Sequence, residues 1–238
     1  YIEDLSSNNV IHTNPPISSD ISSGRCLVMV SDDAERTMCT NLGISTEFCT
    51  SDLDEDVIKA SNYLFLEGYL VASPKGMEVC KKAIEVAKES GTKISISLSD
   101  PNIVNAFKYE IKTLLDMKCD LVFCNEDEAL AYTEKDNILD AVQIFKQISP
   151  NFLITQGSSG CLGFDGKNEF NIPGIKVNAI DSNGAGDMFA GAVLYCITSG
   201  SSLEKGAIFG CYAASKVVGN VGPRLIKNEY YEIKNNFF

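Results

Sequence analysis

A short stretch with glycines between acidic residues is the part of the sequence best suited to chemistry. Residues 181–187 read DSNGAGD and precede a run of small and apolar residues typical of a helix. Gly184, Ala185 and Gly186 would present backbone N–H groups at the start of that helix, where the helix dipole adds partial positive charge. The segment therefore predicts a binding site for an anion.

Asp187 would lie beside that anion, in the first turn of the helix. Binding alone does not explain a carboxylate there, because it would repel the ligand. The arrangement suits phosphoryl transfer, in which Asp187 accepts the proton of an attacking hydroxyl while the amides hold the developing charge. The alternative is structural: Asp187 or Ser182 caps the helix, and the glycines allow tight packing against a sheet. Spacing alone favours neither interpretation.

Two common nucleotide-binding motifs do not match. A dinucleotide fingerprint requires a third glycine where this chain has Phe189, which argues against a dinucleotide-dependent oxidoreductase. A P-loop requires serine or threonine after Gly166-Lys167, but Asn168 follows, and Cys161 stands where the first glycine should be.

The composition indicates a globular protein with an acidic surface. The net charge is −12, so nucleic acid is an unfavourable partner. No apolar run approaches the roughly 20 residues of a membrane helix, and the N-terminus does not resemble a signal peptide. We expect a soluble, cytoplasmic protein without a membrane partner.

Histidine and cysteine limit the chemistry further. The single histidine, His12, excludes a histidine-rich metal site and leaves acid–base work to carboxylates, lysines or tyrosines. The nine cysteines are dispersed and form no C-x-x-C, which argues against a zinc site or a disulfide framework. We expect buried free thiols.

These residues must be positioned by alternating strands and helices that begin near residue 57. Strands are predicted at 62–66, 93–98, 119–124 and 151–155, and a hairpin at 161–165 and 169–172. Helices are predicted at 74–90, 103–117, 126–133, 137–148, 187–199 and 203–219, the last two closing the chain. Ser73 and Gly91 would cap the first of them. The pattern predicts a mainly parallel sheet, covered on both faces, that binds ligands at the carboxyl ends of its strands.

The first 50 residues differ from the rest. A short helix is predicted at residues 1–5, and two β-like runs at 25–31 and 36–42 read as a hairpin. We assign residues 1–50 to an N-terminal helix and a partial β lid, and residues 51–238 to an α/β nucleotide-binding core.

The opening motif closely resembles the D-T-x-G-A-G-D motif of the ribokinase-like (PfkB-type) carbohydrate and nucleoside kinases. The segment NEDE at 125–128 resembles the family's N-x-x-E motif, and ITQGSSG at 154–160 resembles the strand and turn that meet ATP. Residues 24–38, 67–70 and 213–225 resemble the adenosine-kinase-like branch. The resemblance covers nearly the whole chain and implies a ribokinase-like layered fold with a mainly parallel central sheet and a small β lid.

The resemblance also implies roles for individual residues in phosphoryl transfer from ATP to a hydroxyl of a sugar or nucleoside. Asp187 would be the general base, and Gly184, Ala185 and Gly186 the anion hole. Asn125 and Glu128 would organise Mg²⁺ and the ATP phosphates, partly through water. The nucleotide would be contacted by Thr155, Gly157 and Gly160, with Cys211 beside the adenine. Asp181 would help to hold a monovalent cation such as K⁺. A homodimer through the lid is also implied. Without the resemblance, Asn125 and Glu128 read as a helix-start pair.

The chain departs from the family pattern in three places. Ser182 replaces the usual threonine, and Cys211 stands where many relatives carry Asn or His, which affects the expected nucleotide preference. The initial strand and Gly-Gly segment of the family are not found, so we expect these 238 residues to lack part of the sugar pocket and to show little turnover alone. The alternative function is a non-catalytic nucleotide-binding or interaction protein, or an inactive fragment that keeps the fold.

Overall fold

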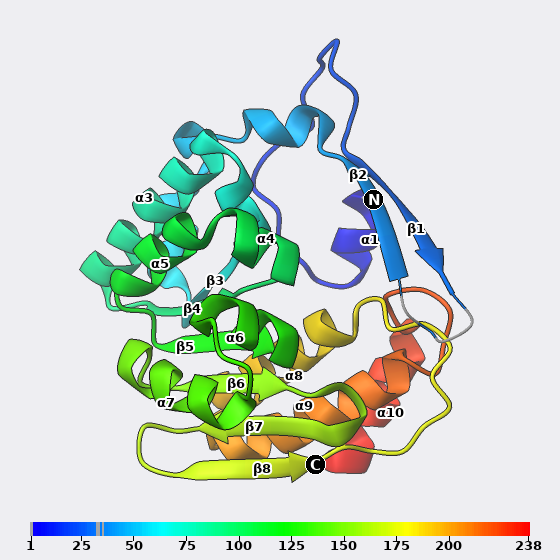
Figure 1. The fold of residues 1–238 in the computed structure, drawn as a ribbon. Coiled ribbons are helices and arrows are strands. Elements are labelled where there is room, and N and C mark those ends of the chain that lie inside the picture. Colours follow the sequence, from blue (N-terminus) through cyan, green and yellow to red (C-terminus); the bar gives the residue numbers. More distant parts are fainter. Residues whose placement is uncertain (1, 32–33, 35) are drawn as a thin grey trace.

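The computed structural model describes residues 2–31, 34 and 36–238 (Figure 1). Two predicted features lie partly outside the described residues. They are the N-terminal helix, at its first residue Tyr1, and the connection between the lid strands, at three of its four residues. Two separate sheets are formed, one of six strands and one of two.

The six-stranded sheet has the order β3-β4-β5-β6-β7-β8. Its four parallel strands are β3 (Tyr63–Glu67), β4 (Lys93–Ser97), β5 (Leu121–Asn125) and β6 (Phe152–Thr155). The antiparallel hairpin β7 (Gly160–Phe164) and β8 (Glu169–Pro173) completes it. The predicted mainly parallel sheet and its terminal hairpin are confirmed.

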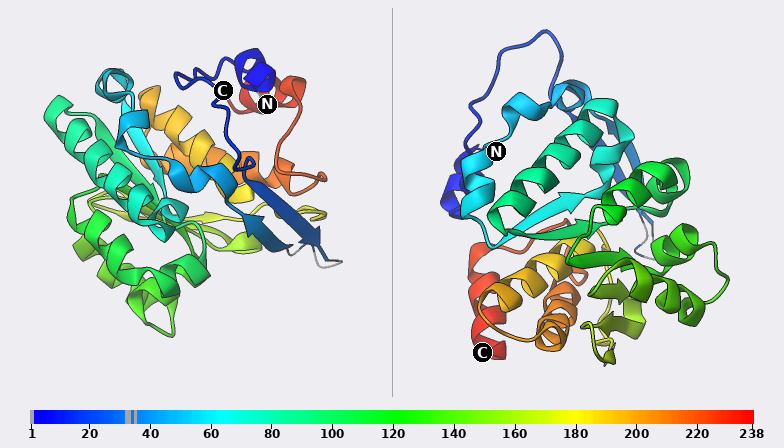
Figure 2. Two further views of the ribbon diagram at one scale, coloured as in Figure 1. Left: turned by 90° about the horizontal axis from the view of Figure 1, so that it is seen from above. Right: turned by 90° about the vertical axis from the view of Figure 1, so that its left-hand side faces the viewer.

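Helices cover both faces of this sheet (Figure 2). The helices are α1 (Ile2–Ser7), α2 (Glu55–Ala60), α3 (Pro74–Ser90), α4 (Pro101–Ala106), α5 (Lys108–Asp116), α6 (Glu126–Thr133), α7 (Ile138–Ile148), α8 (Ala185–Thr198), α9 (Leu203–Val217) and α10 (Lys227–Phe237). Short 3₁₀ turns occur at η1 (Gly43–Glu47), η2 (Thr50–Asp52), η3 (Gly68–Ala72) and η4 (Gly157–Ser159).

The two faces follow from the alternation of side chains along the strands. Ile94 and Ile96 of β4 pack in one apolar core with α3, α5 and α7. Phe123 and Leu153 point to the opposite face and pack in a second core with Phe189 of α8. The start of α8 is therefore held against the sheet by its own apolar residues.

Helix α3 begins and ends where the sequence predicts. The Ser73 hydroxyl accepts a hydrogen bond from the Gly76 N–H at 3.0 Å, and Gly91 ends the helix at φ 77°. Two predictions about helices were wrong. The single helix predicted at 103–117 is two helices, α4 and α5, because the backbone breaks at Phe107 and α4 starts earlier, with Asp100 as its cap. Helix α9 does not close the chain, since α10 follows; only Ile233 of α10 is buried, which explains its weak apolar pattern.

The predicted β lid is confirmed as the two-stranded sheet of β1 (Arg25–Val30) and β2 (Arg36–Asn41), paired antiparallel. Its turn reaches the loop before α8, because the Ser182 N–H donates to the Ala34 carbonyl at 3.1 Å. The lid thus contacts the DSNGAGD segment directly.

All nine cysteines are free, and five of them are buried: Cys80, Cys119, Cys124, Cys161 and Cys196. Burial was wrongly predicted for Cys26 and Cys39, which are exposed on the lid because neither side of that sheet carries a helix layer. Within the described ranges, no helix is both long and apolar enough to cross a membrane.

Candidate active site

Polar residues gather at the carboxyl edge of the parallel strands. Glu67 ends β3, Ser99 and Asp100 follow β4, Asn125 ends β5, and Thr155 ends β6. Asn125 and Thr155 are direct partners in the parallel register. Parallel strands bring their ends to one edge, so these side chains share one region of the surface.

Helix α8 begins beside this edge at a glycine that cannot be replaced without strain. Gly184 is the N-cap residue at φ 78°, and a side chain there would collide with the Pro223 carbonyl oxygen. Gly186, in contrast, faces open space, because a Cβ built on it meets no atom within 4 Å. The chain itself therefore requires Gly184 but leaves room for a ligand at Gly186.

The first amides of α8 are not capped by a side chain. Six other helices, α2, α3, α4, α6, α7 and α9, each start with a side chain that accepts a hydrogen bond from a backbone N–H of the first turn. The structural alternative for Ser182 and Asp187 is not observed: Ser182 Oγ accepts from Arg36 at 3.1 Å, and Asp187 lies inside the first turn. Uncapped N–H groups at a helix start suit an anion.

Asp181 ties this loop to the loop after α9. Its Oδ1 accepts from the Asn183 N–H at 2.9 Å, and its Oδ2 accepts from the Gly222 N–H at 2.8 Å. Asp181 is buried, with only 4% of its surface exposed. Its visible role is structural, and no set of three or more His, Cys, Asp or Glu side chains in the described residues is placed to hold a metal ion.

Asn125 and Glu128 form a reciprocal pair at the start of α6 (Glu126–Thr133). The Asn125 N–H and Nδ2 donate to the two carboxylate oxygens of Glu128 at 3.0 and 2.9 Å, and the Glu128 N–H donates to Asn125 Oδ1 at 2.8 Å. Burial raises the pKa of Glu128 to about 7. This is the geometry that the helix-start interpretation predicts. Because both carboxylate oxygens of Glu128 already accept hydrogen bonds, a metal ion would contact the pair through water molecules.

Arg36 links this pair to the loop before α8. It donates to Ser182 Oγ, and its charge lowers the pKa of Glu128 against the larger opposing effect of burial. Asn125 and Glu128 therefore lie near the DSNGAGD segment at the carboxyl edge of the sheet, although α6 and α8 pack on opposite faces.

The 154–160 turn supplies a second set of glycines. Thr155 Oγ1 donates to the Cys124 carbonyl at 3.5 Å. Gly157 adopts φ 53° with no atom near its Cβ position, whereas a side chain at Gly160, φ 103°, would collide with the Ile172 carbonyl. Gly160 is therefore required by the hairpin, and Gly157 borders open space.

Cys211 is half-buried on α9 and packs in the second core. Burial raises its pKa to about 11, so the thiol is protonated at neutral pH. Its neighbour Cys161 lies on β7, the strand that begins at Gly160.

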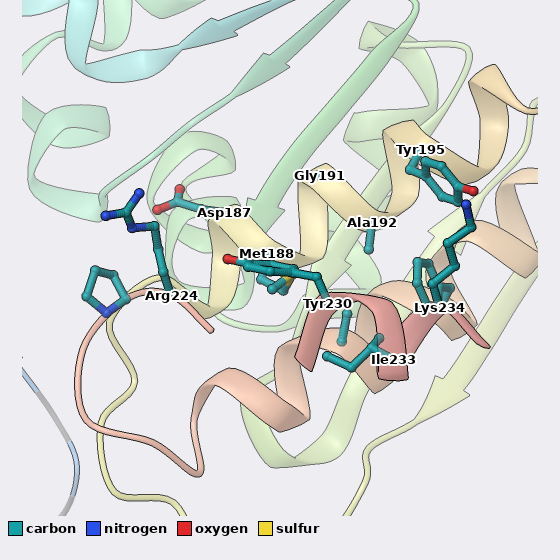
Figure 3. Close-up of a pocket in the computed structure, with 12 residues that line it drawn as sticks. Asp187, Met188, Gly191, Ala192, Tyr195, Arg224, Tyr230, Ile233 and Lys234 are labelled. Atoms are coloured by element: carbon teal, nitrogen blue, oxygen red, sulfur yellow. The ribbon is translucent and has the colours of Figure 1, made fainter. Parts of the chain in front are cut away.

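A cavity of about 450 Å³ runs along α8 from Asp187 (Figure 3). It is lined by Met188, Gly191, Ala192, Tyr195, Phe209, Ala213, Pro223, Arg224, Tyr230, Ile233 and Lys234. Asp187 and Arg224 lie at one end, and Tyr195 and Lys234 at the other. Asp187 thus borders open space as well as the uncapped amides.

Sequence reasoning missed Glu67, Tyr69, Ser99, Asp100 and Arg36 as site residues. The first four follow apolar strands, which is the same signal that identifies Asn125. Tyr69 donates to the Ser99 carbonyl at 3.3 Å, and burial raises its pKa. Arg36 had no comparable signal, because only tertiary structure brings the lid to α8.

The sequence matches, over residues 1–229, the family model described as pfkB family carbohydrate kinase. It is 25% identical over 223 residues to adenosine kinase of Saccharomyces cerevisiae, covering 87% of this chain but 64% of that protein. The crystal structure of adenosine kinase from Sinorhizobium meliloti superposes with a TM-score of 0.94 at 27% identity, covering 99% of this chain and 72% of that one. A putative ribokinase II from E. coli, in complex with ATP and Mg²⁺, shares the fold with a TM-score of 0.87 at 18% identity, covering 99% of this chain and 78% of that one.

Proposed function

The chain belongs to the pfkB family of carbohydrate kinases, and on that basis we propose that it transfers a phosphoryl group from ATP to a hydroxyl of a sugar or nucleoside. The observation that carries the proposal is the uncapped start of α8 with Asp187 in its first turn. Anion-binding amides and a proton acceptor are the two elements that this reaction requires of the protein. Relatives of this chain are named adenosine kinase and sugar kinase, which supports this acceptor class.

Asp187 is the proposed general base. It borders both the helix start and the cavity in Figure 3, so an acceptor hydroxyl can approach it from open space. Removing the hydroxyl proton as the oxygen attacks phosphorus strengthens the nucleophile.

The backbone amides of Gly184, Ala185 and Gly186 are the proposed anion hole, at the start of α8. They would hold the charge that develops on the transferred group. Arg36 adds a positive charge next to this loop through its bond to Ser182. The lid would therefore complete the electrostatic site when it rests on the loop.

The residues present fit Mg²⁺ bound mainly by phosphate and water. Asn125 and Glu128 offer oxygen atoms, which Mg²⁺ prefers, but both carboxylate oxygens of Glu128 already accept hydrogen bonds from Asn125. When bound, the ion would neutralise charge on the ATP phosphates. The pair would orient water around it, and this fits an ion that keeps several of its waters.

Thr155, Gly157 and Gly160 are the proposed nucleotide contacts on the neighbouring strand end, with Cys211 near the adenine. The open space at Gly157 supports a close approach of ligand there. A monovalent cation near Asp181 stays a prediction, because both oxygens of that carboxylate already accept backbone N–H groups.

A homodimer through the lid also stays a prediction. Its support is the apolar surface of the lid strands, where Leu27 is 63% exposed. Light scattering of the wild-type chain and of Leu27→Ser would test it: the variant should dissociate a lid dimer.

Phosphorylation assays with adenosine, ribose and fructose, with ATP as donor, test the proposed reaction. ATP binding measured in parallel distinguishes the proposed kinase from the alternative function. A non-catalytic nucleotide-binding protein would bind ATP but would not transfer phosphate to any acceptor. Transfer from ATP to one of these acceptors supports the proposal, and failure of both binding and transfer in the full-length protein contradicts it.

A further inference from the structure

The loop between α9 and α10 carries Arg224, an arginine that the roles proposed above do not use. Two contacts fix this loop to the DSNGAGD segment. The buried carboxylate of Asp181 accepts a hydrogen bond from the Gly222 N–H at 2.8 Å. Gly184 packs so closely on Pro223 that a Cβ at Gly184 would collide with the Pro223 carbonyl oxygen. The backbone that leads to Arg224 therefore has a set position relative to the start of α8.

The side chain of Arg224 lies at the end of the cavity that Asp187 borders. Both residues line the cavity, and Figure 3 shows them at the same end. The guanidinium also donates to Asp4 Oδ2 of α1 at 2.8 Å. This ion pair lies at the surface, with the two side chains 63% and 39% exposed, and exposed pairs contribute little to stability. A ligand that carries more negative charge than one carboxylate can therefore compete with Asp4 for Arg224.

The start of α8 lies among negative charges, which a phosphoryl group would increase. Burial raises the pKa of Glu67, a hydrogen bond from Ser99 lowers it, and the nearby charge of Asp187 raises it. The sequence has only three arginines, and two of them, Arg36 and Arg224, lie at this site. They come from segments far apart in the sequence. Placing two permanent cations at this edge suits a site that must hold phosphate charge beside carboxylates.

We propose that Arg224 is a catalytic residue, which binds the phosphoryl group in transit and stabilises the charge that develops on it. This inference rests on the proposed function. In that reaction the acceptor oxygen forms a bond to the γ-phosphorus, and the bond from this phosphorus to the oxygen shared with the β-phosphate breaks. The hydroxyl proton passes to Asp187, and ADP leaves. Charge is spread over the equatorial oxygens of the transferred group, and a planar guanidinium can donate parallel hydrogen bonds to two of them.

The test compares the full-length wild type with Arg224→Ala, Arg224→Lys and Asp4→Ala, using ATP and the best acceptor among adenosine, ribose and fructose. Arg224→Ala should lower kcat about 10²- to 10³-fold with little change in the KM for the acceptor, because the contact forms with the group in transit. Arg224→Lys keeps the charge but loses the paired donors, so its kcat should be intermediate. Asp4→Ala removes only the partner in α1, and as the matched control it should keep the wild-type kcat.

A binding measurement separates a contact to the transferred group from a structural role. ADP with Mg²⁺ and aluminium fluoride imitates the group in transit, and a contact made there strengthens binding of this analogue more than binding of ATP. Calorimetry should show that folded Arg224→Ala, checked by thermal melting, loses more affinity for the analogue than for ATP. Equal losses for the two ligands would overturn the inference. A loss of kcat in Asp4→Ala as large as in Arg224→Ala would also overturn it, by reducing Arg224 to a tether for α1.

The same measurements separate this inference from the proposed function. Phosphoryl transfer by the wild type that is unchanged in Arg224→Ala would support the proposed function and contradict the inference. A wild type that phosphorylates none of the acceptors, yet binds the ADP complex in a way that depends on Arg224, would contradict the kinase proposal and support Arg224 as a ligand of the phosphoryl group. If the wild type shows neither transfer nor binding, both are contradicted.

Discussion

The guanidinium of Arg36 in lid strand β2 donates a 3.1 Å hydrogen bond to the hydroxyl of Ser182, in the loop that precedes α8. The two residues are 146 positions apart. This contact places a permanent positive charge of the lid beside the uncapped amides of α8. The contact thus joins the lid to the loop that forms the proposed anion site.

Arg36→Ala should lower kcat/KM about 10- to 100-fold, because it removes one charged donor from the site where phosphoryl charge develops. Steady-state kinetics with ATP and the best acceptor measures this. Arg25→Ala, at the far end of the same hairpin opposite Asn41, is the control and should have little effect. Equal losses in both variants would mean that the lid needs arginine only for its own folding.

Gly184→Ala and Gly186→Ala should separate folding from ligand binding. Gly184→Ala forces a side chain into φ 78° against Pro223 and should lower the free energy of unfolding by about 1–3 kcal/mol. Gly186→Ala meets no neighbour and should change stability by less than about 1 kcal/mol, yet weaken ATP binding by filling the proposed anion site. Urea denaturation and ATP titration check the two effects. Unchanged ATP affinity in Gly186→Ala would remove this residue from the site.

Glu128 should make the stability of the unliganded chain fall as pH rises from about 4.5 to about 7. Burial raises its pKa to about 7 in the folded chain from an ordinary value of 4.5, so the folded chain keeps a proton that the unfolded chain releases in this window. The effect is at most about 3 kcal/mol. Denaturation at pH 5 and pH 8 should show this slope reduced in Glu128→Gln but retained in Glu89→Gln. An identical slope in wild type and Glu128→Gln would show that Glu128 titrates normally.

The sequence was sufficient for features that depend on local chemistry. The Ser73 and Gly91 caps, the positions of the strands along the chain and the lid hairpin all follow from turn residues and apolar spacing. The polar α10 was missed because it buries a single residue. The contact between Arg36 and Ser182 could not be predicted, since no local pattern pairs residues so distant in sequence. The roles assigned to Asp187, Asn125 and Glu128 stay predictions.

The central claim is that Asp187 is the base of a phosphoryl transfer whose charge is held by the amides around it. Asp187→Asn keeps the shape of the side chain and removes the proton acceptor, while the backbone N–H groups of α8 are unchanged. The most direct test is the turnover number of Asp187→Asn relative to wild type in the full-length protein, with ATP affinity measured on the same samples. We predict a fall of about 10²- to 10⁴-fold in turnover with ATP affinity unchanged or improved, because one negative charge near the phosphates is lost. Wild-type turnover in the variant would contradict the account, and loss of ATP binding with the fold intact would make Asp187 a nucleotide or metal contact instead.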